Sequence, residues 1–176
     1  MIMPRQCILR TDRLVTETWL PSDVDDLLAV HSDVETMRFV RNGRPESRSE
    51  TTVLIDEYIA EQAETGFTKW RVADHTGRLV GRAGFGAIDG GRELGYTIRR
   101  ELWGHGFATE IAAGLVKWHL ANAPDVRLYA YVAAENPASR AVLQKTGFDL
   151  IGREVQAQTL CDLFTLNAGG HRCTDE

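Results

Sequence analysis

The stretch "RRELWGHGFATE", residues 99–110, places two glycines, Gly104 and Gly106, directly before a helical pattern. Glycine is a poor helix former and costs about 1 kcal/mol relative to alanine, so its place here requires an explanation. The N-terminus of a helix exposes unpaired N–H groups and a partial positive charge, and residues without side chains let an anion come close to them. The pattern therefore predicts a diphosphate-binding turn; a strand-to-helix turn without a ligand is the alternative.

Two better-known phosphate-binding motifs do not fit this stretch. A Walker loop requires Gly-Lys-Ser or Gly-Lys-Thr, which the sequence lacks. A dinucleotide-binding fold requires a third glycine after Gly106 and an acidic residue at the end of the next strand. Glu135 occupies that acidic position, but the third glycine is missing, and the preceding strands indicate a meander rather than repeated strand–helix–strand units.

The elements that position this turn follow from hydrophobic periodicity and turn residues. A capping box at Ser47 and Glu50 begins one helix, and Gly66 ends it. Gly-containing turns between the middle strands indicate an antiparallel meander, whereas the strand–helix–strand crossover that follows requires a parallel pair, so the sheet is mixed. The predicted strands are 7–19, 67–74, 78–88, 92–100, 126–133, 148–155 and 159–167, and the predicted helices begin near Pro21, Ser47, Gly106 and Pro137.

Length and composition limit the classes of protein. The 176 residues suggest one domain, 1–167, followed by a polar tail, 168–176. The net charge of −5 argues against a nucleic-acid partner, which needs a basic face. The chain start lacks the apolar core of a signal peptide, and no apolar run approaches the roughly 18 residues of a membrane span, so we expect a cytoplasmic protein without membrane contact. Three widely spaced cysteines, Cys7, Cys161 and Cys173, form no metal-binding pair, and no metal is expected.

Three segments together resemble the GNAT superfamily of acetyl-CoA-dependent N-acetyltransferases. They are "TDRLVTE" (11–17), "ELGYTIRRELWGHGFATE" (93–110) and "NPASRAVLQKTGF" (136–148), and within the superfamily they are most similar to the RimJ/RimL-type ribosomal-protein N-terminal acetyltransferases. The resemblance extends over residues 11–167. It implies an α/β (α+β) fold with a mixed, mostly antiparallel central sheet, flanked by helices and splayed between the fourth and fifth strands.

The resemblance implies that acetyl-CoA is the cosubstrate and lies along the splayed strands and the glycine turn. Glu101 departs from the Gln or Arg that usually begins the family's glycine pattern. Asn136 matches the asparagine that contacts the pantetheine arm, with helix capping as the alternative, and Trp103 lies either at the mouth of the site or in the core. The implied cofactor-binding residues are Ile98, Arg99, Arg100, Trp103, Gly104, His105, Gly106, Phe107, Ala108, Thr109, Asn136, Ser139 and Arg140.

The implied chemistry is direct attack of a neutral amine on the thioester. Many members of the superfamily protonate the departing thiolate with a tyrosine, but Leu143 occupies that position here. Ser139 matches the serine of the RimJ/RimL branch, with a plain helix-start serine as the alternative. Glu93 is the candidate base, with a solvated strand carboxylate as the alternative. Making a lysine amine neutral at pH 7 costs about 4–5 kcal/mol, whereas an α-amine with a pKa near 8 costs only about 1.4 kcal/mol.

The sequence therefore predicts an N-acetyltransferase whose acceptor is the α-amine of a peptide or protein. A small-molecule amine, such as a polyamine, an amino acid or an antibiotic, is the first alternative, and a non-catalytic acyl-CoA-binding module is the second. We expect the acceptor pocket between residues 41–66 and 156–160, with residues 40–47 as a mobile flap over it. The sequence does not decide between a monomer and a homodimer.

Overall fold

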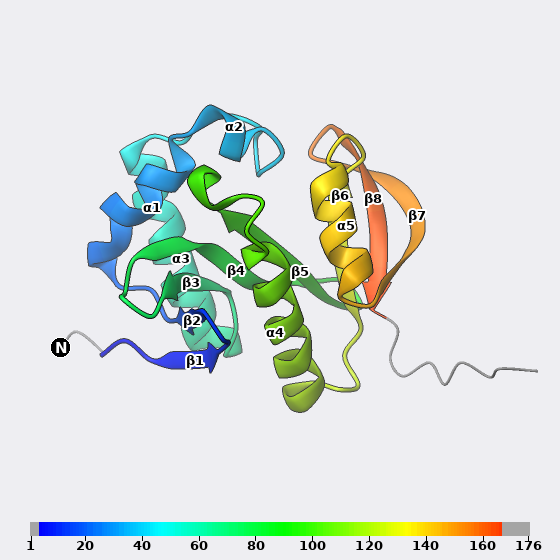
Figure 1. The fold of residues 1–176 in the computed structure, drawn as a ribbon, viewed down its shortest axis with the longest axis horizontal. Helices are drawn as coiled ribbons and strands as arrows, with labels where there is room; N and C mark the ends of the chain where they lie inside the picture. The colour runs from blue at the N-terminus through cyan, green and yellow to red at the C-terminus, as the bar shows by residue number, and fades with distance from the viewer. Residues whose placement is uncertain (1–3, 167–176) are drawn as a thin grey trace, which may run out of the picture.

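Eight strands form one mixed sheet in the computed structural model, which describes residues 4–166 (Figure 1). The strand order is β1-β2-β3-β4-β5-β6-β8-β7, and only the β5–β6 pair is parallel, so the predicted fold class is confirmed. The strands are β1 (Cys7–Arg10), β2 (Leu14–Glu17), β3 (Lys69–Asp74), β4 (Leu79–Ile88), β5 (Gly91–Ile98), β6 (Leu128–Ala133), β7 (Phe148–Gln156) and β8 (Thr159–Leu166).

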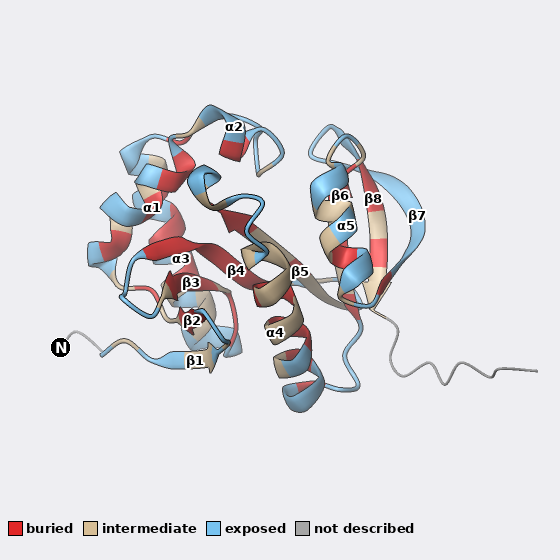
Figure 2. Ribbon diagram, in the orientation of Figure 1, coloured by how far each residue is buried: buried red, intermediate tan, exposed pale blue. Residues whose placement is uncertain are grey.

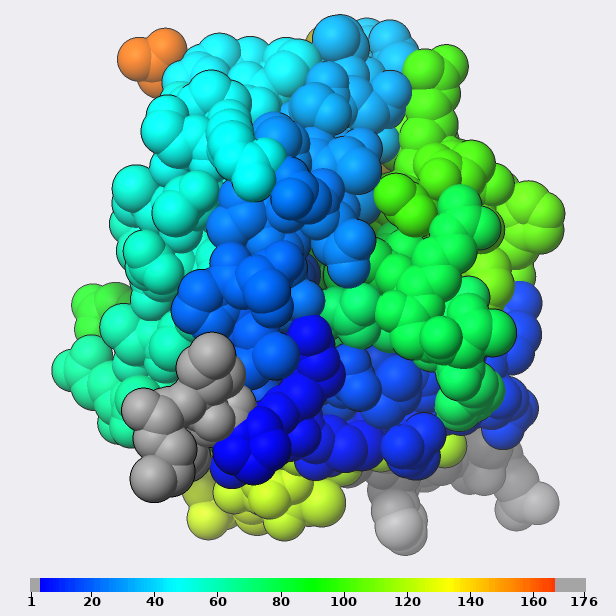
Figure 3. Space-filling view, turned by 90° about the vertical axis from the view of Figure 1, so that its left-hand side faces the viewer, coloured from blue at the N-terminus to red at the C-terminus, as the bar shows by residue number. Residues whose placement is uncertain are grey.

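Helices cover both faces of this sheet. The long helix α3 begins at the predicted capping box of Ser47 and Glu50 and ends at Gly66, whose φ of 79° fits the left-handed C-cap. It packs against α1, and Figure 3 shows the two side by side on the outer surface. The helices are α1 (Val24–His31), α2 (Val34–Met37), α3 (Arg48–Thr65), α4 (Phe107–Asn122) and α5 (Pro137–Lys145), with short 3-10 turns at Pro21–Asp23 and Arg100–Leu102.

One local prediction is wrong, one short helix was not predicted, and one prediction lies outside the described residues. The single strand predicted over 7–19 is a hairpin of β1 and β2, closed where the Thr11 N–H donates to the Leu14 carbonyl at 2.9 Å. The four-residue helix α2 was not predicted; the Asp33 carboxylate caps it by accepting from the Thr36 N–H at 2.7 Å. The predicted tail 168–176 falls outside residues 4–166.

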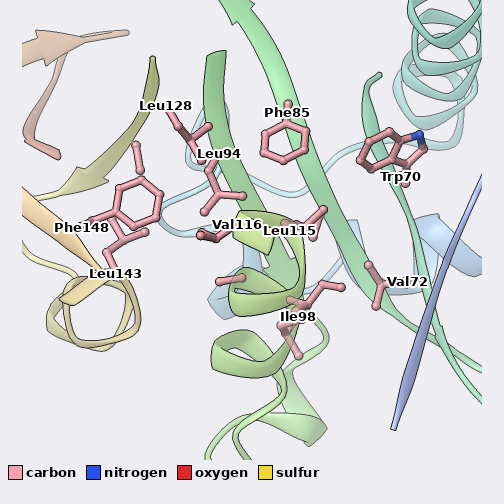
Figure 4. Packing of buried hydrophobic residues seen from close by; sticks show 14 of the residues in the cluster. Trp70, Val72, Phe85, Leu94, Ile98, Leu115, Val116, Leu128, Leu143 and Phe148 are labelled. Atoms are coloured by element: carbon pink, nitrogen blue, oxygen red, sulfur yellow. The ribbon is translucent and has the colours of Figure 1, made fainter. Parts of the chain in front are cut away.

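The larger core lies between the sheet and α4, and it makes β4 and β5 a rigid platform (Figure 4). Trp70, Phe85 and Leu115 are fully buried there, and Trp70 meets Phe85 edge-on with ring centroids 5.8 Å apart. The opposite face of the sheet has a smaller core under α1 and α3, which includes Tyr58. Burial is therefore concentrated in the central strands, whereas β7 at the sheet edge is exposed over nearly its whole length (Figure 2).

The sheet opens between β5 and β6. These strands pair only at Arg92↔Leu128 and Glu93↔Tyr129, whereas β4 stays paired with β5 as far as Ile98. The Arg92 N–H donates toward β6, to the Arg127 carbonyl at 2.9 Å, whereas the Arg99 N–H donates toward β4. Because neighbouring strand residues point to opposite edges, the N–H groups of the even-numbered residues 94, 96 and 98 point toward β6; that of Leu94 belongs to the Glu93↔Tyr129 pairing, and those of Tyr96 and Ile98 point into the gap. The predicted splay between the fourth and fifth expected strands is thereby confirmed as the β5–β6 gap.

Candidate active site

The glycine turn lies at the open end of the β5–β6 gap. Gly104 and Gly106 have φ angles of 76° and 80°, in the left-handed region that favours glycine. A Cβ atom added to Gly104 would meet nothing within 4 Å, so open space lies in front of the turn. Gly106 is the N-cap of α4, and no side chain among residues 4–166 caps the start of this helix. A diphosphate fits this turn, because uncapped N–H groups and a partial positive charge face open space.

Arg13 holds the glycine turn against α4, and sequence reasoning gave this residue no role. Its Nη1 donates to the His105 carbonyl at 2.9 Å, its Nε lies 2.6 Å from a Glu110 oxygen, and its guanidinium stacks 4.2 Å from the Phe107 ring centroid. A Cβ atom added to Gly106 would lie 3.5 Å from Arg13 Nη2. A cation therefore lies beside the predicted diphosphate position. In the sequence, the "TDRL" pattern was the only signal that could have pointed to a role for Arg13.

Trp103 lies at the edge of the gap and not in the core. It is 47% exposed, and its indole Nε1 donates to the Ile98 carbonyl at 2.7 Å. The exposed His105 ring lies beside the turn, with Nδ1 2.8 Å from the Trp103 carbonyl. The side chains of Trp103 and His105 thus satisfy backbone carbonyl groups around the turn. The contact of these two residues with the cosubstrate stays a prediction.

The start of α5 brings Asn136 and Ser139 together. The Asn136 carbonyl oxygen accepts from the Ser139 N–H at 3.2 Å, and its amide nitrogen donates to Ser139 Oγ at 3.2 Å. Asn136 therefore caps the helix, as the alternative interpretation held; its contact with the pantetheine arm stays a prediction. From β5, the Tyr96 hydroxyl crosses to α5 and donates to the Ser139 carbonyl at 3.2 Å. Burial raises the pKa of Tyr96 to about 12. Sequence analysis did not single out this tyrosine.

The predicted phosphate-binding arginines are engaged with carboxylates. Arg99 Nε lies 3.2 Å from a Glu101 oxygen, and Arg100 Nη1 lies 3.7 Å from Asp33. The Arg140 guanidinium contacts the buried Asp162. Their contacts with acetyl-CoA stay predictions, and that of Arg140 would require the guanidinium to leave Asp162. Arg99 and Arg100 also line a pocket of about 450 Å³ with Ala29, Val30, Asp33, Thr36 and Glu101.

Glu93, the candidate base, is paired with a lysine on β3, which lies beyond β4 in the sheet. Its Oε2 lies 3.5 Å from Lys69 Nζ, and burial lowers the pKa of Lys69 against the opposing effect of the Glu93 charge. A Cβ atom at Gly95 would lie 2.6 Å from Lys69 Cε, so this glycine makes room for the lysine. Lys69 was not predicted to belong to the site. Lys69 belongs to none of the sequence motifs, because its role depends on contacts with residues of other strands.

A second pocket, of about 270 Å³, lies between α3 and the sheet and shares Lys69 with this ion pair. It confirms that the segment 41–66 lines a pocket, but residues 156–160 are not among the lining residues. We name it the arginine pocket; its lining residues are Arg41, Leu54, Glu57, Tyr58, Glu61, Lys69, Arg82 and Gly86.

The expected flap 40–47 is anchored at its C-terminal end. Glu46 is only 8% exposed, and its N–H donates to the His31 carbonyl at 2.9 Å. One Glu46 oxygen lies 2.8 Å from His31 Nδ1, and the other lies 2.6 Å from Arg41 Nε. The expectation of a free flap is therefore wrong at Glu46, because a buried carboxylate requires these partners.

No group of three His, Cys, Asp or Glu side chains within residues 4–166 is placed to hold a metal ion. No helix of the described chain is long and apolar enough to cross a membrane. Cys7 and Cys161 carry free thiols, and Cys173 lies outside the described residues.

A mixed sheet that opens beside a parallel strand, with an uncapped glycine turn at the opening, defines an acyltransferase that uses a CoA thioester. Residues 13–149 match the family described as "Acetyltransferase (GNAT) domain". The chain therefore belongs to the GNAT family and is an N-acetyltransferase, and the family uses acetyl-CoA. The resemblance to the GNAT superfamily stated from the sequence is confirmed.

Known proteins support this assignment. The chain is 30% identical over 149 residues to the "Uncharacterized N-acetyltransferase YoaA" of Bacillus subtilis (strain 168), covering 82% of this chain and 84% of that protein. Its fold matches RimL, the ribosomal L7/L12 alpha-N-protein acetyltransferase, in complex with coenzyme A (TM-score 0.78, 19% identity, 93% and 100% of the chains covered). It also matches the microcin C7 self-immunity acetyltransferase MccE in complex with acetyl-CoA and AMP (TM-score 0.73, 15% identity, 88% and 92% covered).

Proposed function

We propose that this enzyme, as a single catalytic domain over residues 1–167, transfers an acetyl group from acetyl-CoA to the α-amine of a peptide or protein. The observation that carries the proposal is the β5–β6 gap, which ends at the uncapped turn of Gly104 and Gly106. An α-amine suits this site because its pKa near 8 makes the neutral, nucleophilic form easy to reach at neutral pH, so that a weak base is sufficient. RimL, whose fold this chain shares, is named an alpha-N-protein acetyltransferase.

The residues of the gap would position the reacting groups. Acetyl-CoA supplies the acetyl group as a thioester. The N–H groups at the start of α4 would hold its diphosphate. The Ile98 N–H points into the gap, where it would donate to the carbonyl oxygen as negative charge develops there. Tyr96 ties β5 to the start of α5 and thereby fixes the width of the gap at Ser139.

Two proton transfers complete the reaction. The new N–C bond forms as the C–S bond breaks; the amine nitrogen loses one proton and the sulfur gains one. Glu93 would accept the amine proton through a water molecule. The Ser139 hydroxyl, held by the Asn136 amide, would donate to the sulfur. The Tyr96 hydroxyl proton is already donated to the Ser139 carbonyl, so Tyr96 acts as a positioning residue.

A mass-shift experiment with two matched peptides tests the acceptor class. One peptide has a free N-terminus and acetylated lysines, and the other has the same sequence with an acetylated N-terminus and free lysines. With acetyl-CoA, we expect one added acetyl group on the first peptide only, with equal release of thiol. Acetylation of the second peptide alone, or of neither, contradicts the proposal.

A small-molecule amine is the second candidate acceptor. The arginine pocket, at about 270 Å³, is smaller than the usual range for drug-sized ligands, which favours an acceptor no larger than one residue. Polyamines, amino acids and antibiotics therefore belong in the same screen. Turnover of one of these amines without turnover of any peptide would replace the proposed acceptor.

A further inference from the structure

Arg82 carries a buried charge without a carboxylate partner of its own. This arginine on β4 is 5% exposed, and its Nε donates to His31 Nε2 at 3.2 Å. Over the part of the chain that the structure describes, Arg82 forms no ion pair with Asp or Glu. Its guanidinium lines the arginine pocket, where it lies 5.9 Å from the Tyr58 ring centroid. A buried charge left unpaired is costly, so a group that enters this pocket can lower its energy by neutralising it.

The contrast with Arg71 shows what a neutralised buried arginine looks like in this sheet. Arg71, on β3, is also 5% exposed, but carboxylates surround it. Glu17 lies 2.9 Å from its Nη1, and Asp26 lies 3.4 Å from its Nη2. The fold therefore supplies counter-charges to one buried arginine and leaves the other to face a cavity.

A buried hydrogen-bond chain holds Arg82 in place. Because Arg82 Nε donates to His31 Nε2, that nitrogen must be unprotonated, so His31 donates from Nδ1 to the Glu46 carboxylate. The other Glu46 oxygen binds Arg41, a second lining residue of the arginine pocket. Arg41 has a φ of 50°, unusual for a residue other than glycine, and such strain is typical of ligand clamps. The chain thus fixes two guanidinium groups toward one cavity.

We propose that the arginine pocket binds a carboxylate of the acceptor, so that the enzyme prefers an acceptor whose amine-bearing residue is aspartate or glutamate. A guanidinium matches a carboxylate because two parallel N–H groups meet two oxygens. A phosphate fits less well, because the carboxylates of Glu57 and Glu61 line the same cavity and would repel two negative charges concentrated on one group. This inference rests on the proposed function for the identity of the reacting amine.

The pocket lies beside the proposed base. Lys69 and Gly86 line it, and Lys69 Nζ is 3.5 Å from Glu93. Gly86 is directly opposite Glu93 in the β4–β5 register. An amine near Glu93 and a carboxylate at Arg82 would therefore belong to one small residue that spans neighbouring strands.

Matched acceptors test the proposal on the wild-type enzyme. We would measure kcat/KM by thiol release for peptides that begin with Glu or Gln and with Asp or Asn, and for free glutamate and glutamine. We expect a preference of about 10- to 100-fold for the acid over its amide, as for a charge-assisted hydrogen bond. Comparing the peptides with the free amino acids shows whether the carboxylate belongs to the first residue of a peptide or to a free amino acid. Equal kcat/KM for acid and amide overturns the proposal and leaves the N-acetyltransferase function intact.

A binding measurement separates this proposal from the proposed function. Glutarate has the carboxylates but no amine, so calorimetry with glutarate requires no turnover. We expect glutarate to bind the wild type and the R127Q control, which removes an exposed arginine charge, and not R82Q. Glutarate binding without turnover of any amine supports the pocket and refutes the proposed acceptor. Absence of glutarate binding to the wild type overturns the pocket proposal.

A second variant covers the case in which R82Q does not fold. R82K keeps the positive charge but loses the planar pair of N–H groups, so we expect the preference for Glu over Gln to fall at least about fivefold. An unchanged preference in a folded R82K or R82Q contradicts the assignment of Arg82.

Discussion

At the scale of single residues, Gly104 separates the energetics of folding from those of binding. Its φ is 76°, and an added Cβ atom would meet nothing within 4 Å. In Gly104→Ala, we therefore expect the free energy of unfolding to fall by only about 1–2 kcal/mol, the backbone cost. The methyl group projects into the predicted diphosphate space, so the Kd for CoA should rise about tenfold or more. Calorimetry with CoA and urea unfolding measure the two effects.

Gly77 provides the control for that variant. It has a φ of 89° and equally open surroundings, but it lies in the β3–β4 turn. Gly77→Ala should lose similar stability and keep the Kd for CoA. Equal weakening of CoA binding in both variants would show that the glycine turn has no special role.

Ser139 is tested by keeping or removing its hydroxyl. Ser139→Ala removes Oγ but keeps the Ser139 N–H that Asn136 accepts from, so the cap of α5 is preserved. If the hydroxyl protonates the thiolate, kcat should fall about 100-fold while the Kd for CoA stays within about twofold. Ser139→Thr, which keeps a hydroxyl, should retain most of kcat. A change in KM alone would assign Ser139 a binding role instead.

His31 makes stability depend on pH. Burial lowers the pKa of His31, as does the Arg82 charge, while the Glu46 hydrogen bond opposes this. The unfolded chain therefore binds more protons than the folded one as pH falls below the unfolded value near 6.5. We expect the free energy of unfolding to decrease from pH 7 to 5.5, by at most about 1.4 kcal/mol per pH unit for this one proton.

Urea unfolding of the wild type and His31→Gln at several pH values checks this prediction. The variant lacks the titrating ring, so its curve should be flatter between pH 7 and 5.5. Burial also lowers the pKa of His119, and this contribution remains in both proteins. Parallel curves for the two proteins would mean that His31 does not titrate differently in the folded chain.

At the scale of elements, Glu110 joins the β1–β2 hairpin to the first turn of α4. Its carboxylate accepts from Thr11 Oγ1, from the Arg13 N–H at 2.8 Å and from Arg13 Nε at 2.6 Å. These hydrogen bonds lower the pKa of Glu110 even though burial raises it. Glu110→Gln should cost about 1.5–3 kcal/mol of unfolding free energy, since it weakens charge-assisted bonds. CoA binding should weaken as well, because Arg13 loses its anchor.

The exposed Glu64 on α3 provides the matched charge change. Glu64→Gln should alter the free energy of unfolding by no more than about 0.5 kcal/mol, as is usual for a surface position. Both proteins would be compared by urea unfolding and by CoA calorimetry. If Glu110→Gln behaves like Glu64→Gln, the carboxylate does not hold the hairpin and the turn together.

The elements with local signals were predictable from the sequence, and those fixed by distant contacts were not. The capping box at Ser47, the Gly-containing turns and the strand–helix–strand crossover predicted α3, the meander and the parallel pair, whereas the splay was implied by the family resemblance. The hairpin of β1 and β2 was missed because its turn contains neither glycine nor proline and the alternation continues through it. Arg13, Lys69 and Arg82 were missed because each acquires its role from residues far away in the chain or on a neighbouring strand.

At the scale of the whole molecule, the two halves of the sheet meet only at the base of β5 and β6, while α4 and α5 also pack against each other (Figure 1). β4 is paired with β5 along the full length of β5, so one edge of β5 is already satisfied. The other edge faces the gap beyond Leu94. This asymmetry gives β5 two classes of N–H group, and a ligand in the gap can hydrogen-bond to only one of them.

Residue-resolved amide hydrogen exchange by NMR distinguishes these two classes. On addition of acetyl-CoA, exchange should slow more at Tyr96 and Ile98, whose N–H groups point into the gap, than at Gly95 and Thr97, which point toward β4. Ligand binding also stabilises the whole fold by mass action, and that effect slows both classes together. The alternation along β5 is therefore the signature of a ligand in the gap. Uniform slowing along β5 would mean that acetyl-CoA binds elsewhere, since global stabilisation alone cannot separate neighbouring residues of one strand.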